Sequence, residues 1–152
     1  MTDPRATFDA AAAASLGQLL LKSARLLDER ALARLREVPG AHPVRPAHTR
    51  LFPHISHEGI RATTIAARLG VTKQAVAPLV ADLVGWGLVE QIPDPTDGRA
   101  SLLRWTAHGV DSLHQGLGIL AEFEAQLSER VGREQVQHVA QVLAELIDLL
   151  EG

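Results

Sequence analysis

Apolar residues recur at helical spacing in three long stretches, one near the N-terminus and two near the C-terminus. The first covers residues 15–37, where leucines return every three or four positions. The second follows Thr106, a suitable N-cap, and extends to about Val131 with apolar positions in alternating steps of four and three, as in a coiled coil. The third covers GREQVQHVAQVLAELIDLLEG, which has one broad apolar face. These helices are too few to bury one another fully, so they predict a partner chain, with a symmetric homodimer as the expected assembly.

Shorter elements are expected in the middle of the chain. VPGAHPVRP breaks the first long helix, and a short helix should follow over residues 46–52, ended by Pro53. ISHEG is a turn, and IRA is a candidate for a very short strand. Thr63 is expected to cap a helix over TIAARLG that stops at Gly70, and Thr72 to cap the next helix. Two strand-like stretches, GLVEQIP and ASLLRWT, flank the turn-rich DPTDGR and predict a hairpin.

The two helices joined at LGVT fit a helix-turn-helix, whose second helix enters the major groove of DNA. Within that second helix, Gln74 can bond adenine with two hydrogen bonds, and Lys73 can reach guanine or a phosphate. Ala77 can contact a thymine methyl group. The residues expected at the base edges are Thr72, Lys73, Gln74 and Ala77. The opposite face is expected in the core and carries Val76, Leu79, Val80 and Leu83.

The hairpin would form a wing beside this motif. Arg99 lies at its tip and can enter a narrow minor groove, which attracts arginine. Asp94 and Asp97 are expected to stabilise the tip by accepting turn amides and by pairing with Arg99 or a neighbouring base. The predicted fold is therefore mainly α with a small β-hairpin wing, a winged helix-turn-helix with N- and C-terminal dimerisation helices.

The stretch TIAARLGVTKQAVAPLVADLVGWGLVEQIPDPTDGRASLLRWTAHG resembles the MarR family of transcriptional regulators. Asp94, Asp97 and Arg99 match the Asp-x-x-Asp-x-Arg wing of that family, and Thr106 matches its threonine-capped helix. The flanking helices fit its dimerisation region in length and order only. The resemblance implies a homodimer that binds a pseudo-palindromic operator in double-stranded DNA, usually as a repressor. Many members are released by a small-molecule effector.

Family pockets lie between the dimer helices and the DNA-binding lobe. The resemblance therefore makes His48, Phe52 and Trp86 candidate pocket residues, with ordinary packing as the alternative for each. The expected organisation is a tail over 1–14, a dimerisation helix and linker over 15–45, a DNA-binding lobe over 46–106 and C-terminal dimerisation helices over 107–152.

The charges are unevenly distributed, although the net charge of −3 does not by itself indicate nucleic-acid binding. Basic residues outnumber acidic residues between positions 39 and 73, and acidic residues dominate from Asp111 onward. This is compatible with one basic and one acidic surface, or with ordinary surface variation. The candidates for phosphate contacts are Arg61, Arg68 and Arg104, with routine surface charge as the alternative. Arg50 is expected to pair within the fold instead.

Several other classes of protein are disfavoured. The chain has no cysteine, which excludes disulfides, thiol redox sensing and cysteine-ligated zinc. It lacks an apolar run long enough to span a membrane and a basic N-terminal region typical of a signal peptide, so a cytoplasmic protein is expected. It also lacks a GxSxG elbow and a glycine-rich phosphate loop, so no enzyme is expected.

Two alternatives to a ligand-responsive DNA-binding regulator remain. One alternative is a winged helix used only for protein contacts, because the recognition helix has a single basic residue, Lys73. A metal-responsive regulator is the other. Four histidines fall within a short stretch, but their spacing defines no common face and no HExxH is present, so neither a metal nor another cofactor is expected. These histidines are His42, His48, His54 and His57.

Pro78 interrupts the recognition helix at its sixth residue and leaves the carbonyl of Gln74 without its usual donor. It lies on the side of Gln74 and Ala81, away from the core residues. We therefore expect the core face to stay packed and the DNA face to bow outward. The region that contacts bases would then be limited to residues 72–77, with more of the binding carried by the wing.

Overall fold

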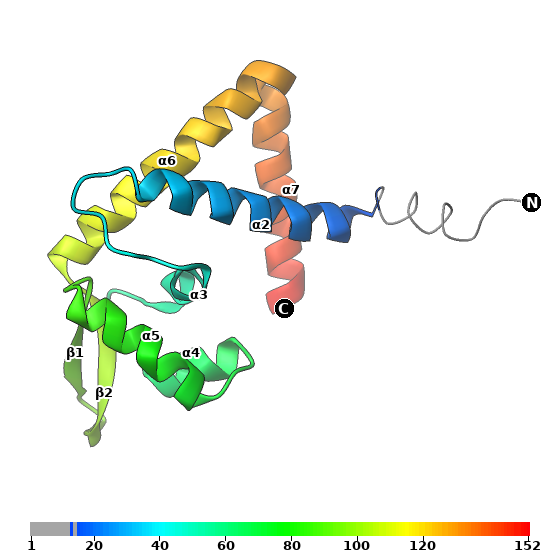
Figure 1. Cartoon of the computed structure of the whole chain (residues 1–152). Helices are drawn as coiled ribbons and strands as arrows, with labels where there is room; N and C mark the ends of the chain where they lie inside the picture. The colour runs from blue at the N-terminus through cyan, green and yellow to red at the C-terminus, as the bar shows by residue number, and fades with distance from the viewer. Residues whose placement is uncertain (1–12, 14) are drawn as a thin grey trace, which may run out of the picture. The chain divides into compact units, whose positions relative to one another are not determined.

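The computed structural model describes residue 13 and residues 15–152. The expected tail over 1–14 lies outside the described residues, apart from residue 13. The described helices and strands are labelled in Figure 1. The chain divides into two compact units after Leu113. The N-terminal helix and its linker therefore belong to the same unit as the lobe expected over 46–106.

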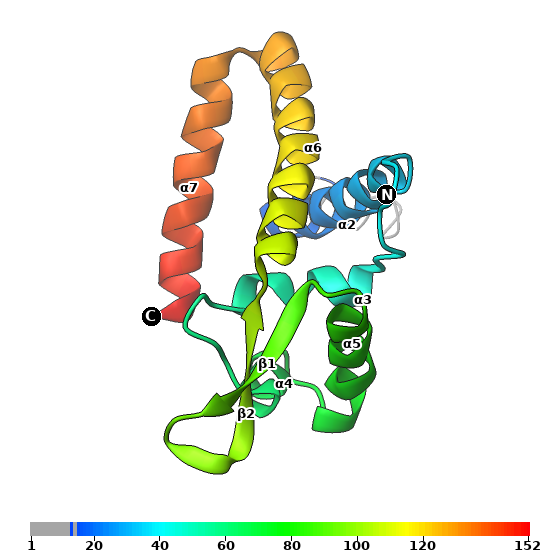
Figure 2. The same ribbon diagram turned by 90° about the vertical axis from the view of Figure 1, so that its left-hand side faces the viewer.

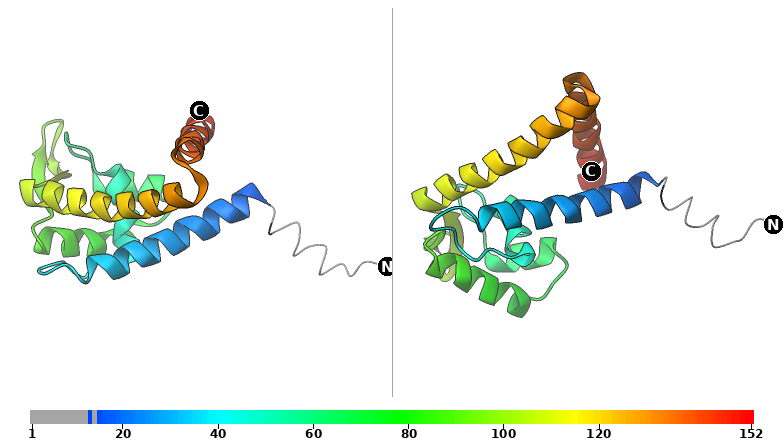
Figure 3. Two further views of the ribbon diagram at one scale, coloured as in Figure 1. Left: turned by 90° about the horizontal axis from the view of Figure 1, so that it is seen from above. Right: turned by 45° about the horizontal axis from the view of Figure 1, so that its top comes forward.

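The first unit begins with α2 (Leu16–Leu35), a single uninterrupted helix in both views of Figure 3. The leucine spacing predicted this helix correctly. The helix expected over 46–52 is instead two elements, α3 (Pro46–Thr49) and a 3-10 turn, η1 (Phe52–His54). Pro53 lies inside η1 and does not end a helix, because the first turn of a helix needs no N–H from that residue.

The helix-turn-helix consists of α4 (Ala62–Arg68) and α5 (Lys73–Gly85). Gly70 has φ +64°, and the amides of Gly70 and Val71 bond back to Ala67 and Ala66, so α4 ends in a Schellman motif as the glycine predicted. Thr72 caps α5 through its side chain, which accepts from the amide of Ala75 at 3.2 Å. Both features depend on residues within one helical turn.

Thr63 does not cap α4, contrary to expectation. The N-cap residue is Arg61, whose carbonyl accepts from the amides of Thr64 and Ile65. The helix begins earlier because Ile60 pairs with Leu103 through two backbone hydrogen bonds, of 3.0 and 2.8 Å, and the chain turns into the helix directly afterwards. The strand expected at IRA is thus confirmed only at Ile60, which forms an isolated β-bridge with Leu103.

Pro78 lies inside α5 without ending it. The core side of this helix stays packed, since Val76, Val80 and Leu83 are buried whereas Pro78 is exposed. The expected outward bow of the opposite side remains a prediction. The helix ends in a second Schellman motif, with Gly87 at φ +70°.

The wing consists of β1 (Val89–Asp94) and β2 (Asp97–Trp105), paired antiparallel (Figure 2). Regular pairing runs from Val89 opposite Trp105 to Pro93 opposite Ser101, and the register shifts beyond Pro93. The core of this unit lies between the hairpin and the short helices. Its most deeply buried members include Leu51, Ile65, Leu83 and Leu103.

The long helix α6 (Ala107–Val131) begins in the first unit and continues into the second. Thr106 caps it as expected, accepting from the amide of Gly109 at 2.9 Å. Gly109 lies so close to Leu88 and to the end of β2 that a Cβ atom there would overlap the carbonyl of Leu88 and lie 2.9 Å from Trp105 Cε3.

The second unit contains the rest of α6 and α7 (Arg133–Glu151), which run antiparallel on either side of Gly132 (Figure 2). Gly132 adopts φ +96° at this turn. Many apolar residues of both helices are exposed in the single chain. None of the described helices combines the length and apolarity of a membrane-spanning segment.

Candidate nucleic-acid interface

The first turns of α5 present the four residues expected at base edges, which we call the recognition surface: Thr72, Lys73, Gln74 and Ala77. All four are exposed. The hydroxyl of Thr72 is occupied by the helix cap. Lys73 and Gln74 have no side-chain hydrogen bond or ion pair to the rest of the described chain, so both side chains are available to a ligand.

Behind the recognition surface, α5 is held against α3 by Asp82. The carboxylate accepts from Arg45 Nη2 at 3.0 Å and from His48 Nε2 at 3.1 Å. His48 is fully buried, and its Nδ1 accepts from the amide of Arg45 at 3.0 Å. Because Nδ1 accepts, the ring proton of a neutral His48 lies on Nε2 and points at Asp82.

The three candidate pocket residues are packed against other rings. The ring of His48 meets Trp86 edge-on with centroids 4.9 Å apart, and Trp86 stacks on His42 at 5.5 Å. Phe52 packs edge-on against Trp105. Both nitrogens of His48 already have partners. A pocket at these residues remains a prediction, and any ligand there would compete with this packing.

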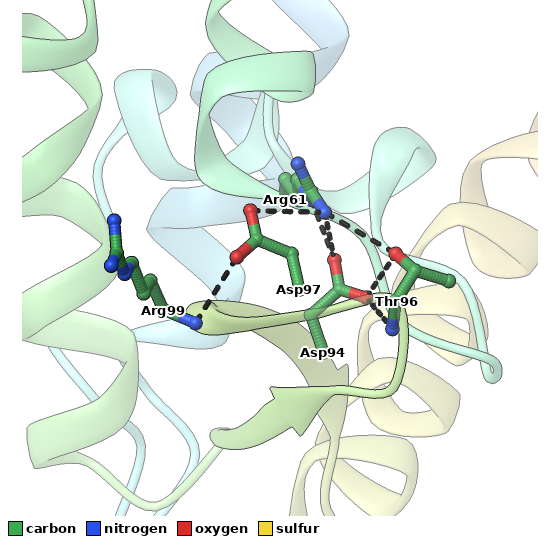
Figure 4. Close-up of polar contacts among 5 residues, drawn as sticks. All are labelled: Arg61, Asp94, Thr96, Asp97 and Arg99. Atoms are coloured by element: carbon green, nitrogen blue, oxygen red, sulfur yellow. Dashed lines mark hydrogen bonds and ion pairs between the residues drawn. The ribbon is translucent and has the colours of Figure 1, made fainter.

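The tip of the wing carries a cluster of polar side chains, which we call the wing-tip cluster: Arg61, Asp94, Thr96, Asp97 and Arg99 (Figure 4). Asp94 Oδ1 accepts from the amide and the hydroxyl of Thr96, at 2.8 and 2.6 Å. Asp97 Oδ1 accepts from the amide of Arg99 at 3.1 Å. The basic side chain that pairs with Asp94 is that of Arg61. The guanidinium of Arg99 points away from both carboxylates (Figure 4).

These contacts set the charge of Asp94. The hydrogen bonds from the side chain and the amide of Thr96, together with those from Arg61, hold the pKa of Asp94 at about 2, below its usual 3.8, although burial opposes the shift. The carboxylate is therefore ionised throughout the physiological range.

The candidate phosphate contacts fall into two groups. Arg61 bonds Asp94, and Arg104 bonds Glu90 from Nε at 3.0 Å and Nη2 at 2.6 Å. Arg68 and Arg99 are exposed and form no side-chain bond to another described residue. Arg50 was expected to pair within the fold, but it has no such partner in the described chain either.

The four histidines considered as metal ligands, His42, His48, His54 and His57, do not form a cluster. His48 lies in the core, while His42 Nε2 lies 3.3 Å from Nε2 of His108 at the start of α6. The described residues contain no group of three side chains that could hold a metal ion.

The sequence did not lead us to expect three of the partners in this region: Asp82, Glu90 and Thr96. Thr96 had a detectable signal, because a residue two positions after an aspartate often bonds it in an Asx turn. Glu90 had a weaker signal, because Arg104 lies on the other strand of the predicted hairpin, directly opposite it. Asp82 had none, since its partners lie on a different element of the fold.

Residues 42–100 match the model of the MarR family. The matched segment contains the recognition surface and all of the wing-tip cluster, so the resemblance seen in the sequence is confirmed for these residues, whereas Thr106 lies beyond the match.

Solved structures share the fold of most of the chain. A mutant of MarR from E. coli is 20% identical, with a TM-score of 0.69 over 88% of this chain and 96% of the other. A transcriptional regulator from Thermotoga maritima is 22% identical, with a TM-score of 0.63 over 89% and 93%. The repressor CouR, bound to a 23-mer DNA duplex, is 23% identical, with a TM-score of 0.61 over 88% and 92%. At these identities the likeness establishes the winged-helix fold with its flanking helices. No curated protein matches the chain.

Proposed function

We propose that the protein is a homodimeric, sequence-specific DNA-binding transcriptional regulator. One observation carries this proposal. At the capped start of α5, the side chains of Lys73 and Gln74 are exposed and form no bond to another described residue. On the neighbouring wing, the side chain of Arg99 is also exposed and has no bonding partner among the described residues, although its backbone amide is bonded to Asp97. The MarR-family match and the DNA-bound state of CouR support the same role.

In this proposal each side chain has a distinct task. Gln74 and Ala77 contact base edges, while Lys73 contacts guanine or a phosphate and Thr72 holds the start of the helix. Arg99 enters the minor groove, and Arg68 contacts the DNA backbone. The two recognition helices of a dimer would lie about one helical turn of DNA apart and bind a pseudo-palindromic operator.

The homodimer is supported by apolar side chains that one chain leaves exposed. On α7, Val139, Ile147 and Leu150 are exposed, and Leu150 retains 76% of its accessible surface. Such a surface on both long helices costs free energy until a partner covers it. Sedimentation equilibrium should give twice the 16.3 kDa of one chain. Ile147→Glu should shift the mass toward the monomer, whereas Gln141→Glu, on the same helix, should not.

We infer further that the protein acts as a repressor in the cytoplasm, responds to a small-molecule effector and is not an enzyme. These finer points follow the MarR-family pattern. An effector can release DNA only through a difference in its affinity for the DNA-binding and the released conformations.

Selection of bound duplexes from a random-sequence pool tests the DNA-binding role. We expect an enriched inverted repeat. Gln74→Ala should then relax the preference at one base pair in each half-site, and Arg99→Ala should weaken binding by about 1–3 kcal/mol if the arginine occupies the groove. An affinity that is unchanged in Arg99→Ala would reject that role for the wing.

The first alternative is a winged helix that binds protein and not DNA, because Lys73 is the one basic residue of the recognition surface. A folded dimer that shows no salt-sensitive binding to any duplex at low salt would favour it.

A metal-responsive regulator is the second alternative, for which the pair His42 and His108 supplies two nitrogens but the described residues supply no third ligand. Two nitrogens 3.3 Å apart fit adjacent corners of a tetrahedral zinc site, where Zn–N bonds are about 2.0–2.1 Å long. Binding of zinc measured calorimetrically, and lost in His108→Ala, would support it. An unchanged heat of titration in that variant would exclude this pair.

A further inference from the structure

We propose that Arg61 is a positioning residue that anchors the wing tip to α4 and so holds Arg99 in place for DNA, instead of contacting a phosphate. This rests on the proposed DNA-binding function. It assigns to Arg61 a task different from the one its charge suggests.

The position of Arg61 is unusual for an arginine. It is the N-cap residue of α4, with φ −70° and ψ 139°, and its side chain makes no bond to the helix. Serine, threonine, aspartate and asparagine are favoured at this position because their oxygens accept orphan amides, which a guanidinium cannot do. Its positive charge also lies at the positive end of the helix dipole. Nothing local therefore favours arginine here.

The side chain instead reaches across to the wing. Nε donates to Asp94 Oδ2 at 2.6 Å, and Nη2 lies within 3.4 Å of Thr96 Oγ1 and 3.8 Å of Asp97 Oδ2 (Figure 4). The side chain of Asp94 is only 5% exposed. One guanidinium thus contacts the end of β1, the turn and the start of β2.

The wing tip needs such an anchor because the strand ladder is interrupted there. Regular pairing runs to Pro93 opposite Ser101, and after a register shift only Asp94 opposite Asp97 is paired, so residues 98–100 have no partner in the ladder. Beyond this point, side-chain bonds hold the backbone: Thr96 to Asp94 and Arg99 to Asp97. Arg61 contacts both of these aspartates, so the backbone position of Arg99 depends on it through Asp97.

The same contacts make Arg61 a poor ligand for phosphate. Two carboxylates face its single positive charge. A phosphate brought to this guanidinium would meet both of them, and moving the guanidinium away would leave the nearly buried Asp94 charge without its partner. Arg68, on the same helix, is exposed and has no carboxylate partner in the described chain.

Asp94→Asn separates the two roles. Asparagine keeps an oxygen that accepts from Thr96 but loses the charge that holds Arg61. If Arg61 bound phosphate, removing a competing carboxylate would leave the affinity for DNA unchanged or raise it. If Arg61 positions the wing, Asp94→Asn should weaken binding by about tenfold, as Arg61→Gln should, and the double variant should be no weaker than either single one.

The probe is the duplex that the wild-type protein enriches from a random pool, with an unrelated duplex of equal length as reference. Binding is measured across a salt series. Arg61→Gln should leave the slope of log K against log salt unchanged, whereas loss of a phosphate contact lowers it by about 0.9. Arg68→Gln provides the matched loss of charge on the same helix. A slope that falls in Arg61→Gln, or tighter binding by Asp94→Asn, would overturn the proposal.

A second measurement needs no DNA. Amide hydrogen exchange at Thr96 and Arg99 should become roughly tenfold faster in Arg61→Gln, while exchange at Leu103, whose amide is bonded to Ile60, stays unchanged. If wild-type protein binds no duplex, the DNA-binding function fails, and the exchange result alone decides whether Arg61 anchors the tip. Exchange at Thr96 and Arg99 as slow as in the wild type would refute the anchor.

Discussion

His48 donates from Nε2 to Asp82 Oδ2 at 3.1 Å, and this bond joins the short helix α3 to the helix that carries the recognition surface. Next to it in the chain, Thr49 donates from its hydroxyl to Asp28 on α2 at 3.0 Å. Two successive residues of α3 therefore connect α2, an expected dimerisation helix, to α5. The orientation of α5 depends on α3 as well as on the hydrophobic core.

Replacing His48 tests this connection. His48→Ala removes a fully buried ring, leaves the amide of Arg45 without its acceptor and removes one of the two donors to the carboxylate of Asp82. We expect the free energy of unfolding in urea to fall by about 2–4 kcal/mol. His57→Ala, at an exposed position, should change it by less than about 0.5 kcal/mol. Equal effects of the two substitutions would contradict a structural role for His48.

Gly109 tests the close approach of α6 to the hairpin. Gly109→Ala would place a methyl group against the carbonyl of Leu88 and the ring of Trp105, so the helix or the strands must shift. We expect a loss of stability of about 1–3 kcal/mol by thermal or urea unfolding. Gly118→Ala, in the same helix with open space around it, should instead stabilise the protein by up to about 1 kcal/mol. A stabilising effect of Gly109→Ala would show that α6 can move away from Leu88 and Trp105 without cost.

The carboxyl group of Asp94 should titrate with a pKa of about 2, below the usual 3.8. The pKa in the folded protein is lower than in the unfolded chain, so the carboxylate stabilises the fold above pH 3.8 and this contribution disappears as the pH falls toward 2. Carbon-13 NMR of the side chain can follow this titration. Thr96→Ala should raise the pKa, because it removes the hydroxyl bond that contributes most to the shift. An unchanged midpoint in that variant would assign the shift to the backbone amide of Thr96 and to Arg61 instead.

Pro78 can be tested by replacement with serine, which restores the amide for the carbonyl of Gln74. The helix should become more stable, because proline in a helix interior costs up to about 3 kcal/mol. We expect DNA specificity to change as well, since straightening the exposed side of α5 would extend the region that contacts bases beyond Ala77. Specificity and affinity identical to the wild type would show that Pro78 is merely tolerated there.

Much of the fold could be predicted because its causes are local. The leucine spacing in α2, the caps at Thr72 and Thr106 and the glycine stop at Gly70 each depend on residues within about one helical turn. The hairpin followed from strand-like residues on both sides of a turn. For the same reason the recognition surface could be located: its exposure follows from the helix period once the core face is known.

Tertiary structure decided what the charged and buried side chains do. Thr63 looked like a helix cap, but pairing of Ile60 with the distant Leu103 started the helix earlier. Arg61 and Arg68 looked equivalent in the sequence, yet one lies beside Asp94, 33 residues away, and the other is free within the described chain. A charge interacts with whatever lies within a few ångströms, and the folded backbone determines which distant residues those are.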